Sequence, residues 1–434
     1  MTEYTPLDEL TGLPERGHLW SVLDDVLIQI RRAKTHCGVL LIDIGNMDNI
    51  QKSIGEEGSE EYFKLIASRI KNSLWEMDTA IRFEKNQFVV VANSILKTED
   101  IHVVMNKIIE YLALDCEVAG QNITPLISIG ITLLPFDGSE VDEIIENTIS
   151  ALKTAKTNSE NSYSYYNTDL GLKIESQEAI KQSILSTLAD ESFVLKLQPK
   201  INTKSGAVCG VETLVRMRDI DGVIVTPDEF IPIAENSNLI LKIGDWVLEK
   251  AHKLGIEWQE KGIDVPISVN ISDVQFKNGA SLLSTLHKLV TESKGKSSNL
   301  TLEVSENVIA ENVELAAALL FEIQSYGFRI SIDGFGVGFS SLSVLSKLKV
   351  DEIKIDRHFL KDVPSDPKST AILKSIIMLG KSMDFRVVVM GVETKAQSDI
   401  LKKYECDEFQ GFLISEPLDW DEFLGWLNNY NQSN

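Results

Sequence analysis

The apolar positions in the first part of the chain alternate between the spacing of helices and the short runs of strands. Apolar residues recur every three or four positions over residues 17–34, which is the pattern of an amphipathic helix. Residues 37–44 (CGVLLIDI) are almost continuously apolar, as expected of a buried strand. The alternation continues with helices expected at 59–75, 100–113 and 140–156, and strands at 80–83, 87–92 and 125–134. Strands that alternate with helices predict an α/β domain of about 165 residues.

The second part of the chain repeats a strand-and-helix rhythm more regularly. Segments of helical length separate most of its short apolar runs. Eight such units within about 250 residues predict a (βα)₈ barrel. The eight expected strands are Phe193–Gln198, Gly210–Arg216, Pro266–Asn270, Leu300–Val304, Arg329–Asp333, Glu352–Ile355, Arg386–Val389 and Asp407–Gln410.

A polar segment divides these two patterns. Thr157–Asp169 (TNSENSYSYYNTD) is rich in Ser, Asn and Thr, a composition typical of a connection between domains. We therefore expect a first domain at residues 1–165, a linker helix at 166–180 and a barrel domain at 181–434.

Polar residues stand at or near the ends of most expected barrel strands. The C-terminal ends of barrel strands meet on one face, where active sites form. Three acids and one amide among these residues offer the hard oxygen ligands that Mg²⁺, Mn²⁺ or Ca²⁺ prefer. Any single acid after a strand is equally typical of a helix N-cap or a solvated loop. The residues are Gln198, Glu212, Arg216, Asn270, Glu303, Asp333, Lys354 and Gln410.

Composition narrows the class of protein. The 434 residues include 65 acidic and 42 basic side chains, a formal charge of −23, which disfavours a nucleic-acid partner. Four scattered cysteines without a CxxC pair indicate neither a zinc framework nor a disulfide scaffold, and fit a reducing compartment. The N-terminal segment lacks the pattern of a signal peptide, and no apolar run approaches the length of a membrane span. We expect a cytoplasmic protein without membrane insertion.

Motifs in the second half, from about 176 to 430, resemble the EAL domain, a barrel phosphodiesterase that hydrolyses cyclic di-GMP. Their order and spacing agree with that family. The matching segments are Leu197–Pro199, Glu212–Arg216 (ETLVR, where the family has EALxR), Phe230–Glu235, Ser268–Asn270, Glu303–Glu306, Asp333–Gly336, Lys354–Arg357, Gly391–Thr394 and Gln410–Phe412.

The first half, from about 5 to 165, resembles the GGDEF domain, which has the α/β fold of the cyclase palm. Asp8–Leu13 (DELTGL) matches that family's opening motif, and Asp43 falls at its first metal-binding aspartate. The signature segment reads Glu84–Phe88 (EKNQF), so the amides Asn86 and Gln87 replace its acids. Amides cannot act as carboxylate bases at neutral pH. We therefore expect no diguanylate cyclase activity and a dimerisation or regulatory role for this domain.

The resemblance implies that the EAL catalytic set is also incomplete. Glu212, Asn270, Glu303 and Asp333 would hold a first metal, Mg²⁺ or Mn²⁺, with Ca²⁺ as a non-catalytic substitute. Gly334 stands where the family has the aspartate of its second metal, and Met390 where it has its proposed general base. Losing a general base costs about 10²–10⁴ in rate. With Asn86 and Gln87 in the first domain, neither catalytic centre is expected to be intact.

More of the positions that line the family's cyclic dinucleotide pocket are retained than of its catalytic positions. Arg216 can pair with a phosphate through its planar guanidinium, and Lys354 adds a second cation. Glu306 resembles the residue that anchors the loop at 335–342, which in the family forms dimer contacts, and Glu393 resembles a structural residue that orients its neighbours. The retained pocket positions are Gln198, Leu214, Arg216, Pro232, Asn270, Lys354, Gln410 and Pro417.

Three functions remain open at this point. The first is a non-enzymatic cyclic di-GMP receptor that signals through an unidentified protein partner. The second is a ligand-independent interaction regulator built on two inactive enzyme domains. The third is a weak metal-dependent phosphodiesterase. A homodimer is compatible with each of them.

Overall fold

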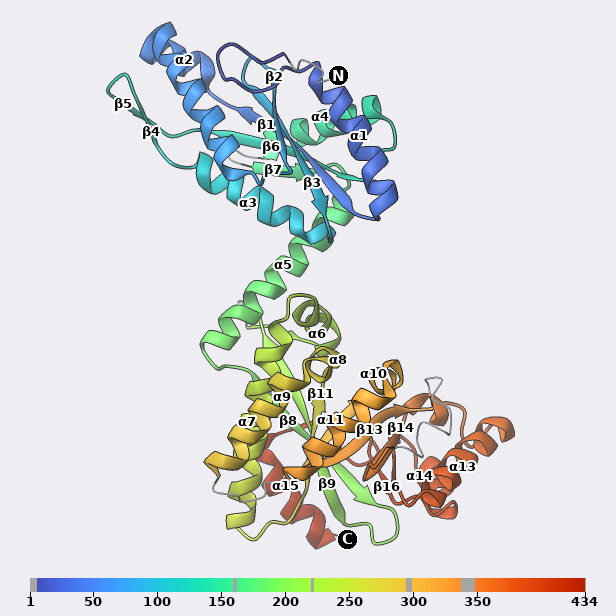
Figure 1. Cartoon of the computed structure of the whole chain (residues 1–434). Helices are drawn as coiled ribbons and strands as arrows, with labels where there is room; N and C mark the ends of the chain where they lie inside the picture. The colour runs from blue at the N-terminus through green and yellow to red at the C-terminus, as the bar shows by residue number, and fades with distance from the viewer. Residues whose placement is uncertain (1–5, 159–161, 220–221, 294–298, 337–347, 434) are drawn as a thin grey trace. The chain divides into compact units, whose positions relative to one another are not determined.

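The computed structural model of the chain describes residues 6–158, 162–219, 222–293, 299–336 and 348–433 (Figure 1). The chain divides into two compact units, Met1–Ala179 and Ile180–Asn434. Helix α5 (Thr168–Ala189) contributes residues to both units. No helix within the described ranges combines the length and the apolar character that crossing a lipid bilayer requires.

A five-stranded sheet forms the centre of the first unit, in the strand order β2-β3-β1-β6-β7. Strand β1 pairs antiparallel with both β3 and β6, whereas β6 and β7 are parallel. The strands are β1 (His36–Ile44), β2 (Thr79–Glu84), β3 (Gln87–Ile95), β6 (Ile127–Leu134) and β7 (Ser162–Tyr165).

Helices cover both faces of this sheet because successive side chains of a strand point to opposite sides. Leu40 and Ile42 of β1 belong to a buried cluster shared with α2 and α3, whereas Val39 and Leu41 belong to a cluster shared with α1 and α4. The predicted α/β fold is thus confirmed. The helices are α1 (His18–Ala33), α2 (Met47–Ser73), α3 (Ile101–Leu112) with the preceding turn η1 (Thr98–Asp100), and α4 (Val141–Asn158).

Three local features differ from the sequence expectation. Helix α2 begins at Met47 rather than at 59, and Gly55 interrupts it with a left-handed φ of 75°. The strands β4 (Cys116–Val118) and β5 (Gln121–Ile123) form a hairpin too short to leave a periodic signal. Strand β7 lies inside the polar segment that marks the expected domain boundary, and α5 begins directly after it.

A closed barrel of eight strands forms the centre of the second unit, as predicted. The strands follow the order β9-β11-β12-β13-β14-β15-β16-β8, and a β8–β9 pairing closes the ring. They are β8 (Val194–Asn202), β9 (Val208–Arg218), β11 (Ile267–Ile271), β12 (Leu300–Ser305), β13 (Arg329–Phe335), β14 (Glu352–Ile355), β15 (Arg386–Val389) and β16 (Glu408–Phe409).

One barrel strand departs from the regular (βα)₈ pattern. Strand β8 runs antiparallel to both of its neighbours, β9 and β16, whereas the other neighbouring pairs are parallel. Only residues 203–207 join β8 to β9. A parallel connection needs a crossover of a dozen or more residues, so this link permits only a hairpin.

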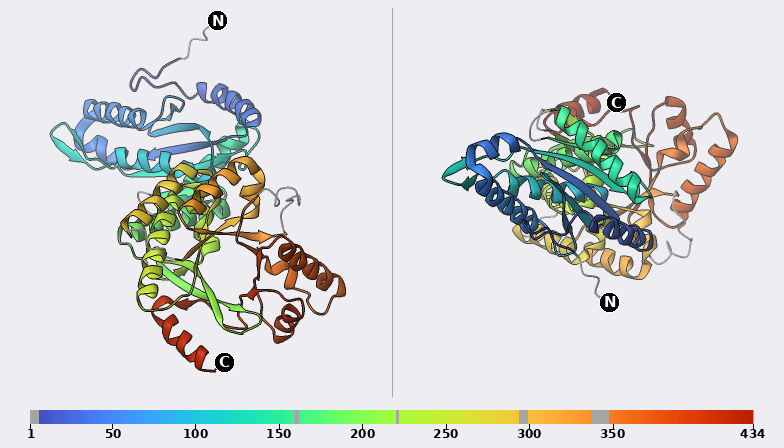
Figure 2. Two further views of the ribbon diagram at one scale, coloured as in Figure 1. Left: turned by 60° about the horizontal axis from the view of Figure 1, so that its bottom comes forward. Right: turned by 90° about the horizontal axis from the view of Figure 1, so that it is seen from above.

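Helices lie outside the ring of strands, as Figures 1 and 2 show. Apolar residues of the strands and helices form one continuous buried cluster. The remaining elements are β10 (Ile224–Val225), α6 (Pro227–Asn236), α7 (Leu239–Glu260), α8 (Asp273–Lys277), α9 (Gly279–Glu292), α10 (Glu306–Glu311), α11 (Val313–Ser325), η2 (Arg357–Leu360), α13 (Pro367–Ser382), α14 (Lys395–Lys403), β17 (Leu418–Asp419) and α15 (Trp420–Ser433).

Candidate ligand-binding site

Four neighbouring barrel strands bring the predicted metal ligands together. Glu212 comes from β9, Asn270 from β11, Glu303 from β12 and Asp333 from β13. Asn270 is directly opposite Glu303 in the pairing of β11 with β12. Asn270 Nδ2 donates a hydrogen bond to Glu212 Oε1 at 2.7 Å. The fold therefore groups the four side chains, as the sequence predicted.

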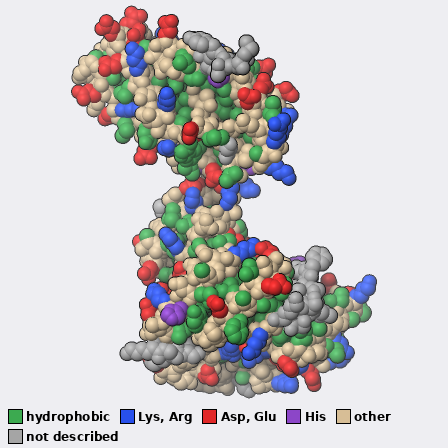
Figure 3. All heavy atoms as spheres, viewed as in Figure 1, with side chains coloured by type: hydrophobic (Ala, Val, Ile, Leu, Met, Phe, Trp, Pro, Cys, Tyr) green, Lys and Arg blue, Asp and Glu red, His purple; other side chains and the backbone are tan. Residues whose placement is uncertain are grey.

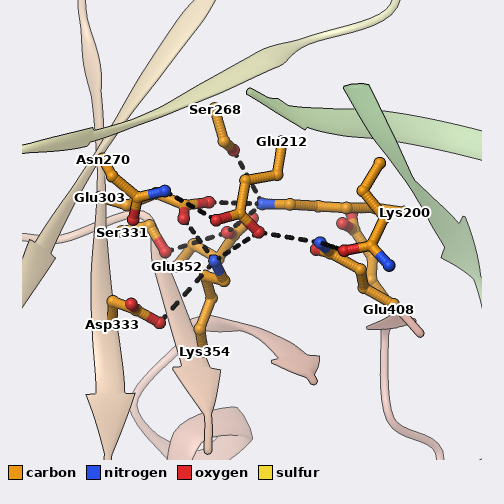
Figure 4. A network of polar contacts seen from close by, with 12 residues as sticks. Lys200, Glu212, Ser268, Asn270, Glu303, Ser331, Asp333, Glu352, Lys354 and Glu408 are labelled. Carbon is orange, nitrogen blue, oxygen red and sulfur yellow. Dashed lines mark hydrogen bonds and ion pairs between the residues drawn. The ribbon is translucent and has the colours of Figure 1, made fainter. Parts of the chain in front are cut away.

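The ammonium group of Lys354 lies among these carboxylates (Figure 4). Its Nζ donates to Glu212 Oε2 at 3.0 Å and to Glu303 Oε2, and lies 3.7 Å from Asp333 Oδ1. Burial lowers the pKa of Lys354, but the charges of Glu212 and Glu303 raise it well above the ordinary lysine value. Lys354 is therefore a permanent cation that neutralises the carboxylate group.

A second buried lysine, Lys200 on β8, extends this network along the inside of the barrel (Figure 4). Its Nζ donates to Ser268 Oγ at 2.8 Å, Glu303 Oε1 at 2.9 Å and Glu352 Oε1 at 3.2 Å. Burial lowers the pKa of Lys200, and Glu303 and Glu352 more than reverse that effect. Sequence reasoning missed Lys200 and Glu352. The signal was available, because Lys200 is two residues after Gln198 and shares its face of the strand.

Glu303 joins the two lysines through its two carboxylate oxygens. Burial raises the pKa of Glu303, but the adjacent charges of Lys200 and Lys354 lower it to about 2. Glu303 is therefore a fully ionised group in the middle of the barrel. Its charge is compensated on both sides, which is the condition under which a buried carboxylate is tolerated.

This donor set does not fit a divalent cation in the arrangement observed. Lys354 occupies the space between Glu212 and Glu303, and Gly334 offers no side-chain donor. Over the part of the chain that the structure describes, no three or more His, Cys, Asp or Glu side chains are placed to hold a metal ion. In this arrangement, the protein's own lysine side chains compensate the charges of the carboxylates.

A cavity of about 280 Å³ opens beside the network. Gln410 Nε2 donates to Gln198 Oε1 at 2.7 Å and to Glu212 Oε2 at 2.8 Å, so two amides and one carboxylate form a fixed polar wall. Five of the eight residues predicted to hold a dinucleotide line this cavity, namely Gln198, Leu214, Arg216, Gln410 and Pro417.

The other three predicted ligand residues do not line this cavity. Asn270 and Lys354 lie behind Glu212 and hydrogen-bond to it, so they act on the cavity through that carboxylate. Pro232 is exposed on α6. The cavity instead gains Arg357 and Phe412, which the sequence did not single out as ligand positions, and the exposed Glu393.

Met390 also lines the cavity, directly after strand β15. Its thioether neither accepts a proton at neutral pH nor binds hard cations well. Gly334 has a left-handed φ of 70°, and among the described residues other than its two chain neighbours no atom lies within 4 Å of where a Cβ would be. Both positions thus lack a carboxylate, and the space beside Gly334 is open.

The loop that follows β13 is described only at its start. Glu306 Oε2 accepts a hydrogen bond from the backbone N–H of Gly336 at 2.9 Å, which is the kind of contact that anchors a loop. Residues 337–347, which include most of the loop expected at 335–342, lie outside the described residues.

The first unit has its own polar cavity, of about 850 Å³, on the side of the sheet that carries α2. The buried Asp43 accepts hydrogen bonds from Gln87 Nε2 at 2.8 Å and Asn86 Nδ2 at 3.4 Å, and forms an ion pair with Lys156. The amides at the signature positions are therefore donors to the aspartate. No carboxylate stands beside it to share a cation at these two positions.

Comparison with known families decides the identity of both units. Residues 179–417 match the family described as EAL domain, and residues 5–162 match the diguanylate cyclase GGDEF domain. The chain belongs to the EAL domain family. With the GGDEF domain before it, the chain is a GGDEF–EAL tandem of cyclic di-GMP signalling, so both resemblances found in the sequence are confirmed.

Two curated proteins illustrate what this GGDEF–EAL tandem is similar to. MucR of Pseudomonas aeruginosa, named a bifunctional diguanylate cyclase/cyclic di-GMP phosphodiesterase, is 30% identical over 418 residues, which is 96% of this chain and 61% of MucR. The signaling protein YkoW of Bacillus subtilis is also 30% identical, over 96% of this chain and 52% of YkoW. The chain thus spans between half and two thirds of the length of these relatives.

Solved structures resemble the EAL domain in particular. The PaMucR phosphodiesterase in complex with c-di-GMP matches with a TM-score of 0.54 and 33% identity, over 56% of this chain and 99% of that one. An EAL domain protein from Listeria monocytogenes matches with a TM-score of 0.50 and 28% identity, over 57% of this chain and 98% of that one. EAL domains generally depend on a divalent metal. The positions of Lys354, Gly334 and Met390 therefore raise the question of whether this EAL domain binds one.

Proposed function

We propose that this protein is a cyclic di-GMP receptor that binds the dinucleotide in its EAL domain without hydrolysing it, and that it signals through contacts with another protein. The observation that carries this proposal is Met390 on the wall of a cavity that keeps Arg216, Gln198 and Gln410. An arginine and two amides suit an anionic ligand that also forms hydrogen bonds, whereas Met390 supplies no base at the position where the family has its proposed one. The similarity to a PaMucR structure with bound c-di-GMP supports the choice of ligand.

Charge compensation explains how the cavity accepts a phosphate. Glu212 would repel an anion, but Lys354 pairs with it at 3.0 Å and removes that repulsion. Arg216 is half-buried on β9, and its guanidinium donates a hydrogen bond to the carbonyl of Val215 at 2.8 Å, the one side-chain bond found for it among the described residues. Its remaining N–H groups are available for bidentate pairing with a phosphate.

The GGDEF domain is proposed to serve as a regulatory or dimerisation module. Its aspartate at the first metal position is already neutralised by Lys156 and hydrogen-bonded by two amides. This arrangement leaves Asp43 without the free carboxylate that a metal-dependent cyclase requires. The same domain nevertheless keeps a complete sheet and two buried cores, which suffice for a folded partner surface.

A calorimetric titration of the full chain with cyclic di-GMP, run once with Ca²⁺ and once with EDTA, tests the proposal. We expect saturable binding at micromolar affinity or better in both buffers. Arg216→Gln should weaken it by about tenfold or more, because a charge-assisted hydrogen bond is lost. Arg218→Gln, an exposed change on the same strand, is the matched control and should bind like wild type.

Two other outcomes would replace the proposal. If neither buffer gives heat or a thermal shift, the chain is a ligand-independent interaction regulator. Overnight incubation with Mg²⁺ or Mn²⁺, followed by chromatography, tests turnover. Accumulation of linear dinucleotide in proportion to protein concentration would make the chain a weak phosphodiesterase.

A further inference from the structure

Arg357 stands at the mouth of the barrel opposite Arg216. It is the first residue of η2, directly after β14, whereas Arg216 lies on β9. In the closed ring, β14 is the fourth strand from β9 in either direction. The two guanidinium groups therefore come from opposite sides of the barrel, and both line the cavity of about 280 Å³.

The Arg357 side chain is exposed and available for a ligand. Within the described part of the chain, neither a hydrogen bond nor an ion pair involving its guanidinium is found. Its backbone is nevertheless held closely against the turn after β15, because a Cβ on Gly391 would lie only 2.6 Å from the Cβ of Arg357. The residue is thus fixed at its base while its charged end has no partner.

A second cavity continues from the first at this position. It measures about 330 Å³ and shares Arg357, Gly391 and Glu393 with the first. Ligand pockets usually measure about 300–1,000 Å³, so the first cavity alone is small for a molecule built of two nucleotides. His358 also lines the second cavity, but its Nδ1 lies 3.0 Å from Asp356 Oδ1, which occupies that side chain. Lys361 adds a cation to the second cavity only, so Arg357 is the cation that lines both cavities.

The charges of the ligand and of the cavity call for this second cation. A cyclic dinucleotide has two phosphates on opposite sides of its ring, each with one negative charge. Lys354 already compensates Glu212, whereas no ion pair is found for the exposed Glu393 among the described residues. Without Arg357, the first cavity would offer one arginine for two phosphates beside the Glu393 carboxylate, since Lys361 lines only the second cavity.

We infer that Arg357 is a second phosphate anchor, which pairs with the phosphate of cyclic di-GMP that Arg216 does not reach and directs the ligand into the second cavity. This inference rests on the proposed receptor function. It assigns a binding role to a side chain outside the set expected from the sequence.

Titration of the full chain with cyclic di-GMP and, separately, with GMP tests the inference. Arg357→Gln should weaken binding of cyclic di-GMP by about 10- to 100-fold, as expected for a lost hydrogen bond between charged groups. It should change GMP binding by less than about threefold, because one phosphate can remain on Arg216. Arg357→Lys should restore part of the affinity, since lysine keeps the charge but lacks the planar fork.

Two controls separate a binding role from a structural one. The thermal midpoint of Arg357→Gln should equal that of wild type, because the guanidinium has no partner to lose, and Arg218→Gln should leave both ligands unaffected. If Arg357→Gln binds cyclic di-GMP within threefold of wild type while Arg216→Gln does not, the inference is wrong and the receptor function stands. If wild type itself does not bind cyclic di-GMP, the proposed function fails and this inference fails with it.

Discussion

The ammonium nitrogen of Lys156 lies 2.6 Å from Oδ2 of Asp43 in the GGDEF domain. Asp43 is buried on β1, whereas the Lys156 side chain reaches it from α4 and stays partly exposed. The chain therefore supplies its own counter-ion to the aspartate at the first metal position. This ion pair predicts that Lys156 stabilises the GGDEF domain.

Replacing Lys156 by glutamine should lower the free energy of unfolding of the GGDEF domain by about 1–2 kcal/mol. The buried Asp43 would keep only the amide donors Gln87 and Asn86. Urea unfolding at pH 7 measures the effect. Lys153→Gln, at an exposed position of the same helix, should change stability by less than about 0.5 kcal/mol. Equal midpoints for the two variants would show that the ion pair contributes nothing.

Replacing Lys200 by methionine should destabilise the EAL domain by about 3–5 kcal/mol, because Glu303 and Glu352 lose a buried partner. Lys196→Met is the control on the same strand. Its lysine forms a partly exposed pair with Asp419 at 3.4 Å, and its loss should cost less than about 1 kcal/mol. Adding Glu352→Gln to Lys200→Met should recover part of the loss. If denaturant unfolding gave the two lysine variants equal free energies of unfolding, the buried ion pairs of Lys200 would not contribute as expected.

Restoring carboxylates at both altered positions should restore turnover. We expect the pair Gly334→Asp and Met390→Glu to give measurable hydrolysis of cyclic di-GMP with Mg²⁺ or Mn²⁺, and each single variant to give less. The left-handed φ of 70° at Gly334 should cost about 1–2 kcal/mol with a larger residue, but the space around it is open. A double variant that folds, binds ligand and yields no linear product would contradict the explanation given for the loss.

Removing divalent metal should leave ligand binding nearly unchanged. Lys354 already provides the positive charge between Glu212 and Glu303. The dissociation constant of cyclic di-GMP in EDTA should therefore stay within about threefold of its value with Ca²⁺. Affinity that rises more than about tenfold on adding Ca²⁺ would mean that a metal displaces the lysine from the carboxylates.

The stability of the GGDEF domain should carry a pH dependence that comes from Asp137. Burial raises the pKa of this carboxyl, although the N–H of Leu133 donates to its Oδ2 at 2.7 Å. A raised folded-state pKa of an acid means that stability is lost as pH rises from the unfolded value of 3.8 through the folded one. Asp137→Asn keeps the acceptor for Leu133 and removes the charge.

The thermal midpoint of Asp137→Asn relative to wild type should therefore be higher at pH 7 than at pH 4. Melting curves of both proteins across that range provide the measurement. A difference that shrinks towards neutral pH would have the wrong sign and would show that the carboxylate is stabilising in its ionised form.

Much of the fold could be predicted from the sequence because its signals are local. Most barrel strands are short runs dominated by apolar residues, as in Arg386–Val389, although β16 consists of only the two residues Glu408–Phe409. The antiparallel direction of β8 could also have been predicted from the sequence. The five residues between β8 and β9 are too few for a crossover helix. The strand β7 was hidden because its alternating Ser and Tyr residues read as a polar connection.

The site could be predicted only in part because its chemistry depends on side chains far apart in the chain. Strand ends identified Glu212, Glu303 and Asp333, which the barrel does bring together. The sequence could not predict that Lys354 lies between these carboxylates, because its position depends on how deep its side chain lies in the closed barrel. Arg357 ends a segment that matches the family, but nothing in the sequence marked it as a ligand residue, because an arginine after a strand is ordinary on any protein surface.

The buried network of Lys200, Glu303 and Glu352 also restricts how this chain can change over evolutionary time. Lys200 pairs with both carboxylates, so replacing it leaves the Glu352 carboxylate without its ion pair inside the barrel. Neutral drift at these positions would have to pass through an unstable intermediate or exchange several residues together. Gly334 and Met390, which are half-buried and lie outside this network, could by contrast change one at a time at little structural cost. A substitution at these two positions is therefore easier to accommodate than one inside the charged interior of the barrel.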